Sequence, residues 1–187
     1  MIIIPTLLSL LRIVLTPVFV ILFWQGGNRL LLSIFIFTIA ALTDAYDGYF
    51  ARRYGVTSSW GAFLDPMADK VLICTTLICL VLKGLVPWWL VCVIMIRDGV
   101  VTFLRSNAIK QGLYLPTTWM AKCKTVAQFV AIYTAFLWLV VHEVMHYSGA
   151  VWSLFALRIV MYAVGALTLY TGVDYVRTYL QLRQKND

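Results

Sequence analysis

Long apolar runs separated by short polar breaks follow one another along most of this chain. A helix needs about 20 mostly apolar residues to cross a bilayer. Six predicted stretches come close to that length: Leu7–Trp24, Leu30–Tyr54, Trp60–Leu82, Trp88–Ile109, Val126–Val141 and Val151–Tyr175. Glycine and proline in the breaks supply turn chemistry. The pattern predicts an all-α integral membrane protein, with six transmembrane helices in one bundle and a single domain over residues 1–187.

The composition agrees with a bilayer environment. Hydrophobic residues make up 62% of the chain and charged residues only 12%, whereas soluble domains are about 25% charged. Nucleic-acid binding is a poor interpretation, because no soluble segment carries a basic surface. The four cysteines form no CxxC pair, so we expect buried thiols rather than a zinc site. The first apolar run follows no basic segment, and we expect it to be retained.

The basic residues predict the orientation of the helices. With a cytoplasmic N-terminus, Arg29 and Lys83 face outward, and the inner loops and ends carry eight basic residues: Arg52, Arg53, Lys110, Lys122, Lys124, Arg177, Arg183 and Lys185. Cytoplasmic loops of membrane proteins are enriched in such residues. Both termini are therefore predicted on the cytoplasmic side of the cell membrane. The net charge of +7 also suits anionic lipid headgroups.

Four of the eight acidic residues gather at the predicted cytoplasmic ends of the second and third helices: Asp44, Asp47, Asp65 and Asp69. Carboxylates within membrane helices are costly and usually mark function. Four neighbouring carboxylates repel one another and take up protons unless cations hold them. All-oxygen sites suit Mg²⁺ or Mn²⁺, and four aspartates could hold two such ions about 3.5–4 Å apart.

The spacing of these residues places them on two helical faces. On the second helix, five positions recur at i, i+3, i+4, i+7 and i+8: Asp44, Asp47, Gly48, Ala51 and Arg52. On the third helix, Gly61, Asp65 and Asp69 recur every four residues. The small residues leave room for a ligand to approach the backbone, although glycine in membrane helices also serves close helix packing.

These eight positions resemble the signature of the CDP-alcohol phosphatidyltransferases: Asp44-x2-Asp47-Gly48-x2-Ala51-Arg52-x8-Gly61-x3-Asp65-x3-Asp69. The resemblance implies a homodimeric enzyme that transfers the phosphatidyl group of CDP-diacylglycerol to an alcohol and releases CMP. It implies Asp44, Asp47 and Asp65 as ligands of two divalent ions, Mg²⁺ or Mn²⁺, and Asp69 as both ligand and general base. The resemblance further implies a cytidine diphosphate pocket lined by four residues: Gly48, Arg52, Ser58 and Gly61.

Other segments resemble the branch of this family that makes phosphatidylglycerol phosphate in bacteria. They are Ile4–Arg12, Leu64–Lys70, Arg97-Asp98 with Arg105, and Ala121–Thr125. The resemblance implies glycerol 3-phosphate as acceptor. Substitutions relative to the branch at Thr6, Ser9, Asp98 and Ala121 leave inositol phosphate, serine and phosphatidylglycerol as alternative acceptors.

The acceptor phosphate is expected to contact three basic residues: Arg105, Lys122 and Lys124. The predicted spans place the two lysines in the loop before the fifth helix, where they could instead be interfacial residues that extend toward the headgroups. Arg97 lies deep within the fourth helix, and a buried partnership with Asp98 would satisfy its charge.

Two other functions are weighed against this one. His142-Glu143-Val144-Met145-His146 matches HExxH, which binds zinc in metalloproteases when it lies on a helix. It falls at the opposite end of the fifth helix from the aspartate cluster, and the chain has no third histidine. Polar residues at a helix end are the better explanation. A cation transporter would account for the intramembrane aspartates, but not for Arg52 and the glycines beside them.

Overall fold

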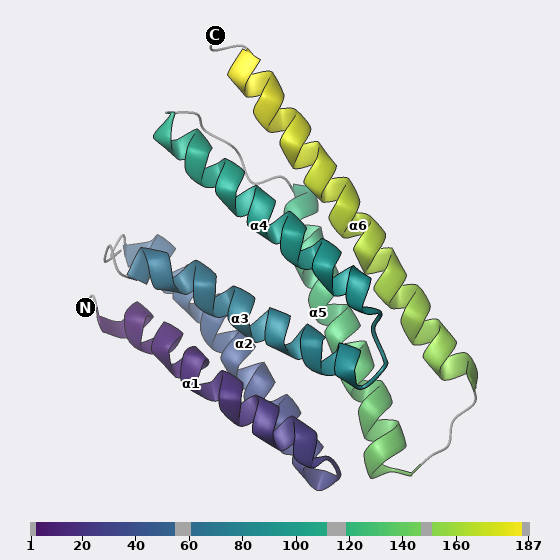
Figure 1. Ribbon diagram of the computed structural model, residues 1–187. Coiled ribbons are helices and arrows are strands. Elements are labelled where there is room, and N and C mark those ends of the chain that lie inside the picture. The colour runs from purple at the N-terminus through teal and green to yellow at the C-terminus, as the bar shows by residue number, and fades with distance from the viewer. Residues whose placement is uncertain (1–2, 55–60, 112–118, 147–150, 185–187) are drawn as a thin grey trace. The chain divides into compact units, whose positions relative to one another are not determined.

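The described part of the chain consists of helices joined by turns (Figure 1). The computed structural model describes residues 3–54, 61–111, 119–146 and 151–184. These ranges contain six α-helices and one short π-helix: α1 (Ile3–Gln25), α2 (Asn28–Tyr54), α3 (Gly61–Leu82), α4 (Trp88–Lys110), α5 (Trp119–Leu139), η1 (Val140–Val144) and α6 (Val151–Gln184). The prediction of an all-α chain with six long helices is confirmed.

The largest extensions beyond the predicted bounds are at one end of α5 and of α6. α5 begins at Trp119 rather than Val126, and α6 continues to Gln184 rather than ending at Tyr175. The apolar pattern marks only the part of a helix that lies in hydrocarbon, whereas backbone hydrogen bonding continues into polar residues beyond it. The placement of Lys122 and Lys124 in a loop was therefore wrong, because both lie in the first turns of α5.

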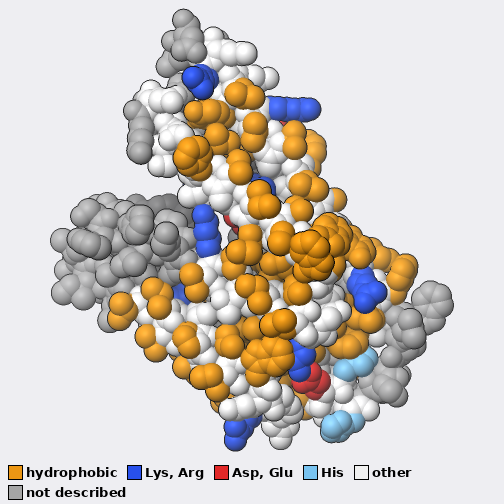
Figure 2. Space-filling model, viewed as in Figure 1, with side chains coloured by type: hydrophobic (Ala, Val, Ile, Leu, Met, Phe, Trp, Pro, Cys, Tyr) orange, Lys and Arg blue, Asp and Glu red, His pale blue; other side chains and the backbone are white. Residues whose placement is uncertain are grey.

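The outer surfaces of these helices are apolar. Two described helical stretches, Cys123–Val144 and Ser153–Gln184, are long and apolar enough to cross a membrane, and three shorter apolar stretches lie in α1, α2 and α3. Large side chains such as Phe35 and Phe103 are 60% and 66% exposed, and Figure 2 shows apolar side chains over much of the visible face. Extensive exposed apolar surface is typical of a protein that lipid surrounds.

The first of two compact units comprises Met1–Cys79 and Leu139–Ser148. Within it α1 packs along α2, and the two helices are joined at Gly26 and Gly27, whose φ angles of 64° and 54° favour glycine. Phe19 lies at the centre of their interface, with ring centroids 5.6 Å from Phe23 and 5.8 Å from Phe37. All three rings are fully buried. This packing fixes the helix that carries Asp44 and Asp47.

The second unit comprises Leu80–Trp138 and Gly149–Asp187, and in it α4 packs against α6. The contacts advance along both helices in the same direction, so α4 and α6 are parallel. Trp89 stacks on Tyr162 near one end, with centroids 5.8 Å apart. Ala108 packs with Tyr175 and Tyr179 near the other.

Close approach of α4 and α6 depends on Gly165. A Cβ atom at this position would lie 2.2 Å from Cδ1 of Leu90, a side chain that is almost fully buried. Small residues let membrane helices approach in this way. The interface therefore has no room for a side chain at position 165 unless Leu90 moves.

We expect Gly165→Ala to lower the melting temperature of the purified protein by roughly 2–10 °C, because overpacking costs about 1–3 kcal/mol. Leu90→Ala in the same chain should restore part of the loss. Gly99→Ala, at a helical glycine with open space around it, is the matched control and should not lower the melting temperature. Equal effects at positions 99 and 165 would contradict this account of the interface.

Candidate active site

The signature residues lie where α2 ends and α3 begins. Asp44 and Asp47 precede the end of α2 at Tyr54, and Asp65 and Asp69 follow the start of α3 at Gly61. At a rise of about 1.5 Å per residue, all four Cα atoms lie within about 15 Å of the helix ends that flank residues 55–60. The four aspartates therefore belong to one end of this helix pair and to the first unit.

The helical assignment supports the predicted faces. Residues 44–52 are continuous α-helix, as are residues 61–69, so spacings of three, four, seven and eight residues return to one face. The side chains at these positions lie outside the described residues, as does that of Lys122, and Ser58 lies outside them altogether. The roles assigned to all of them stay predictions.

The donor set fits a hard divalent cation. Every predicted ligand is a carboxylate, and oxygen ligands of this kind suit Mg²⁺ or Mn²⁺ rather than zinc. Among the side chains that the structure describes, no group of three or more His, Cys, Asp or Glu residues could hold a metal ion. The aspartates of α2 and α3 therefore remain the candidate metal ligands.

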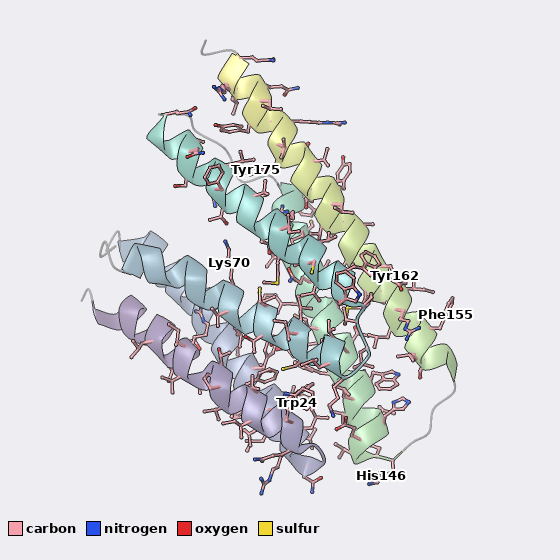
Figure 3. All side chains as sticks on the ribbon, viewed as in Figure 1. Trp24, Lys70, His146, Phe155, Tyr162 and Tyr175 are labelled. Carbon is pink, nitrogen blue, oxygen red and sulfur yellow. The ribbon has the colours of Figure 1, made fainter. Side chains whose placement is uncertain are left out.

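Two described cations belong to the same unit as the aspartates. Lys70, labelled in Figure 3, follows Asp69 on α3 and is half-buried. Arg12, on α1, is among the largest fully buried side chains of the structure. A buried arginine in a membrane helix is costly and usually functional. No role was predicted for Arg12, although a charge inside the first apolar run is a signal for one.

A partly buried ion cluster joins the helices of the second unit. The ammonium of Lys124 on α5 lies 2.8 Å from each carboxylate oxygen of Asp98 on α4. Arg97 donates to Asp98 Oδ1 over 3.0 Å and to Thr171 Oγ1 on α6 over 3.2 Å. The partnership predicted between Arg97 and Asp98 is confirmed. Two cations share one carboxylate, so these three side chains carry a net charge of +1.

The cluster changes the interpretation of Lys124. Its side chain is 5% exposed and is held by Asp98, so Lys124 is not an interfacial lysine that extends toward the headgroups. Arg105 lies two turns beyond Asp98 on α4 and is exposed. The predicted acceptor residues thus differ in their surroundings. The pairing of Asp98 with Lys124 escaped the sequence analysis because only packing brings residues 26 positions apart together.

The HExxH segment does not form a zinc pair on a helix. His142 and Glu143 lie in the π-helix η1, and His146 follows it with a φ of +50°. The two histidines therefore do not share one face of an α-helix, as the protease motif requires. A Cβ atom at Gly26 would lie 3.4 Å from Glu143 Oε2, so this carboxylate packs against the turn between α1 and α2.

The class of the protein follows from these observations and from comparison with known proteins. A helical chain with lipid-facing surfaces carries a carboxylate signature typical of phosphoryl chemistry. The model of the CDP-alcohol phosphatidyltransferase family matches residues 2–173. The chain belongs to this family and is a transferase.

Curated relatives cover nearly the whole chain. It is 40% identical over 179 residues to the probable phosphatidylglycerophosphate synthase of Mycobacterium tuberculosis (strain H37Rv), covering 94% of this chain and 80% of the relative. It is 34% identical to the CDP-diacylglycerol–glycerol-3-phosphate 3-phosphatidyltransferase of Salmonella typhimurium, covering 92% of each. The Escherichia coli K12 protein of the same name is 32% identical, again covering 92% of each.

We expect Asp98→Ala to destabilise the protein by about 3–5 kcal/mol, because it leaves the buried charges of Lys124 and Arg97 without their shared carboxylate. Thermal unfolding in detergent measures this loss, and Asp98→Ala combined with Lys124→Met should recover part of it. Asp174→Ala is the matched control, since Asp174 on α6 forms no ion pair within the described residues. If Asp98→Ala and Asp174→Ala unfold at the same temperature, the cluster contributes no stability.

Proposed function

We propose that this protein transfers the phosphatidyl group of CDP-diacylglycerol to glycerol 3-phosphate. The products are CMP and phosphatidylglycerol phosphate, a step in phospholipid biosynthesis. The observation that carries the proposal is the complete eight-residue signature on two consecutive helices of a chain that belongs to the family. Relatives that cover nearly all of the chain bear the corresponding names, which supports glycerol 3-phosphate as acceptor.

Four aspartates would hold two divalent ions: Asp44, Asp47, Asp65 and Asp69. When bound, Mg²⁺ or Mn²⁺ would neutralise the pyrophosphate and acidify the attacking hydroxyl. The all-carboxylate donor set and the common helix end support this assignment. Four neighbouring carboxylates at the end of a membrane helix pair repel one another, and bound cations would relieve this repulsion.

The reaction forms one phosphorus–oxygen bond and breaks another. A hydroxyl oxygen of the acceptor attacks the phosphorus attached to diacylglycerol, and the bond from that phosphorus to the oxygen of CMP breaks. Asp69 accepts the proton of the hydroxyl, and little basicity is needed for this transfer once the hydroxyl is acidified. The remaining task of the protein is to position the two substrates and to balance phosphate charge.

The donor pocket would be built from the signature itself. Arg52, on the Asp face of α2, is suited to a forked contact with phosphate. Gly48 and Gly61 carry no side chain and leave room for the nucleotide to approach the helix backbone. Ser58, between the two helices, completes the proposed set. Arg53 is assigned instead to the positive inner surface, because it lies off the Asp face.

The acceptor pocket would use basic residues of α4 and α5. Arg105 is exposed, so an anionic ligand can reach it from solvent, and Lys122 is the second candidate. Lys124 would act together with Asp98 rather than alone, since its ammonium contacts both carboxylate oxygens. The surplus positive charge of the Arg97–Asp98–Lys124 cluster supports an acceptor that carries a phosphate over a neutral one.

The substrate determines where the site must lie. CDP-diacylglycerol keeps its acyl chains in the bilayer and its nucleotide in water, so the carboxylates must lie near an interface. We assign that interface to the cytoplasmic side of the cell inner membrane, with six spans and both termini inside, from the distribution of basic residues. A homodimer is proposed from the family resemblance. The protease alternative finds no support in the geometry of His142 and His146.

Purified protein given CDP-diacylglycerol and Mg²⁺ should release CMP with glycerol 3-phosphate as acceptor. Inositol phosphate, serine and phosphatidylglycerol, offered separately at the same concentration, should give at most a few per cent of that rate, because a site that hydrogen-bonds one acceptor rejects others strongly. Release of CMP is the measurement. Turnover with one of these and none with glycerol 3-phosphate would place the protein in another branch of the family.

Asp69→Asn should lower kcat by about 10²–10⁴-fold, because it removes the proton acceptor and one proposed metal ligand. Asp174→Asn is the control and should retain wild-type turnover. Chelation of divalent ions should abolish the wild-type activity, and added Mg²⁺ or Mn²⁺ should restore it. Near wild-type turnover in Asp69→Asn, or in strong chelator, would contradict the proposed site.

A further inference from the structure

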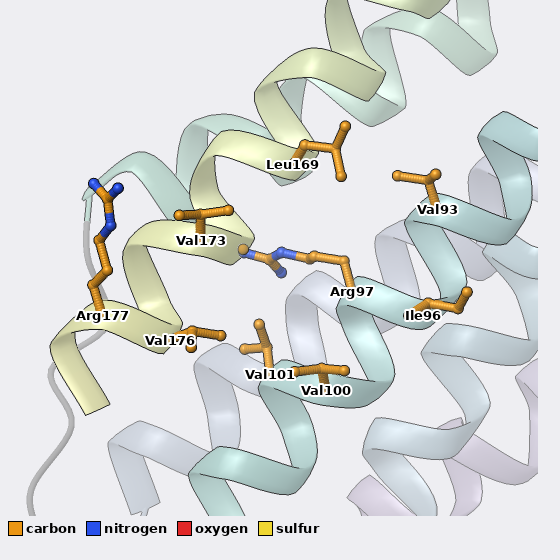
Figure 4. Close-up of a pocket in the computed structure, with 10 residues that line it drawn as sticks. Val93, Ile96, Arg97, Val100, Val101, Leu169, Val173, Val176 and Arg177 are labelled. Atoms are coloured by element: carbon orange, nitrogen blue, oxygen red, sulfur yellow. The ribbon is translucent and has the colours of Figure 1, made fainter. Parts of the chain in front are cut away.

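An apolar groove runs between α4 and α6 within the second unit (Figure 4). Its volume is about 360 Å³. Ile96, Val100 and Val101 form the α4 side, and Leu169, Val173 and Val176 form the α6 side. Ile96, Val173 and Leu169 are 66%, 51% and 52% exposed, so the groove opens outward. We refer to it as the α4–α6 groove.

Two guanidinium groups interrupt this apolar surface. Arg97 lines the middle of the groove and Arg177 lines one end, and none of the ten described lining residues is acidic. The Nε atom of Arg97 is buried and has no hydrogen-bond partner among the described residues. A buried donor without a partner is costly, above all where lipid replaces water. The groove is therefore apolar with an excess of positive charge.

Gly172 allows Arg97 to occupy the groove. A Cβ atom at position 172 would lie 2.9 Å from Arg97 Cγ, so a larger residue on α6 would displace the arginine. With glycine there, the Arg97 side chain crosses to α6 and reaches Thr171. The arginine in the groove is thus built into the contact between the two helices.

The dimensions of the groove match one leaflet of a bilayer. Eight residues of α6 separate Leu169 from Arg177, a rise of about 12 Å. Half of the hydrocarbon core is about 15 Å thick. Arg177 follows the predicted end of the last span, at the level of the headgroups. An acyl chain that enters the groove at Arg177 would therefore extend as far as Leu169.

We propose that the α4–α6 groove binds an anionic glycerophospholipid of the surrounding bilayer, with its phosphate at Arg177 and one acyl chain along the groove. Affinity arises mainly from the guanidinium groups. An acyl chain in the groove has nearly the same free energy as one among other lipid tails, so it contributes little to binding. The groove lies wholly in the unit that lacks the aspartate signature, so the proposal does not rest on the transferase activity.

The test uses the full-length protein purified in detergent and native mass spectrometry. The probes are phosphatidylglycerol and phosphatidylcholine with identical acyl chains. Wild-type protein should retain phosphatidylglycerol in preference to phosphatidylcholine. Arg177→Gln should weaken retention of phosphatidylglycerol about fivefold, which is the typical contribution of one basic residue to affinity for an anionic membrane surface. Val173→Trp, which fills the groove, should reduce retention of both lipids.

Arg183→Gln is the matched control, because Arg183 is an exposed arginine of α6 outside the groove. It should leave lipid retention unchanged, and all three variants should keep the melting temperature of the wild type. Equal losses in Arg177→Gln and Arg183→Gln would overturn the proposal in favour of general surface charge. Conversion of dimer to monomer by Val173→Trp without loss of lipid would instead assign the groove to a second copy of the chain.

The donor lipid is the remaining competitor for the groove. CDP-diacylglycerol should not displace the retained phosphatidylglycerol, and Arg177→Gln should leave the KM for CDP-diacylglycerol unchanged. Displacement together with a raised KM would overturn the proposal, because the groove would then hold the substrate. Absence of CMP release from wild-type protein would refute the proposed function and leave the lipid-retention result intact.

Discussion

Charge inside a lipid-solvated helix bundle must be neutralised within the protein, because hydrocarbon offers no water to do so. This constraint governs both units of the chain. In the first, four aspartates belong to one end of the α2–α3 pair. In the second, Asp98 is shared by Lys124 and Arg97, and one positive charge is left over. We propose that metal ions neutralise the aspartates and that an anionic ligand binds near the positive charge of the cluster.

The chemistry proposed for the family fits this division of charge. A pyrophosphate donor needs cations around it, and the carboxylates would supply the ligands that hold such cations. An acceptor that carries a phosphate needs positive charge, which α4 and α5 would provide through Arg105 and the Arg97–Asp98–Lys124 cluster. Neither group requires a soluble domain. A chain of 187 residues made of six long helices can therefore carry both sets of groups.

Glycine controls how closely α4 and α6 approach and what lies between them. Gly165 lets Leu90 pack against the backbone of α6. Gly172, seven residues further along α6, does the same for Arg97. The second contact places a charged group beside an apolar groove and joins it to Thr171. Helix packing, the ion cluster and the proposed lipid site are thus parts of one interface.

The order and type of the helices were determined by the sequence alone, because a bilayer demands long apolar runs and helical hydrogen bonding. The faces that carry Asp44, Asp47, Asp65 and Asp69 followed from the helical period. Tertiary structure decided what periodicity does not encode, which is contact between distant positions. It paired Lys124 with Asp98, 26 residues away, and formed a groove at Arg97. It also placed His142 and Glu143 of the HExxH segment in a π-helix. These features depend on packing between helices. The apolar pattern does not specify that packing, because lipid tails and apolar side chains are equally apolar.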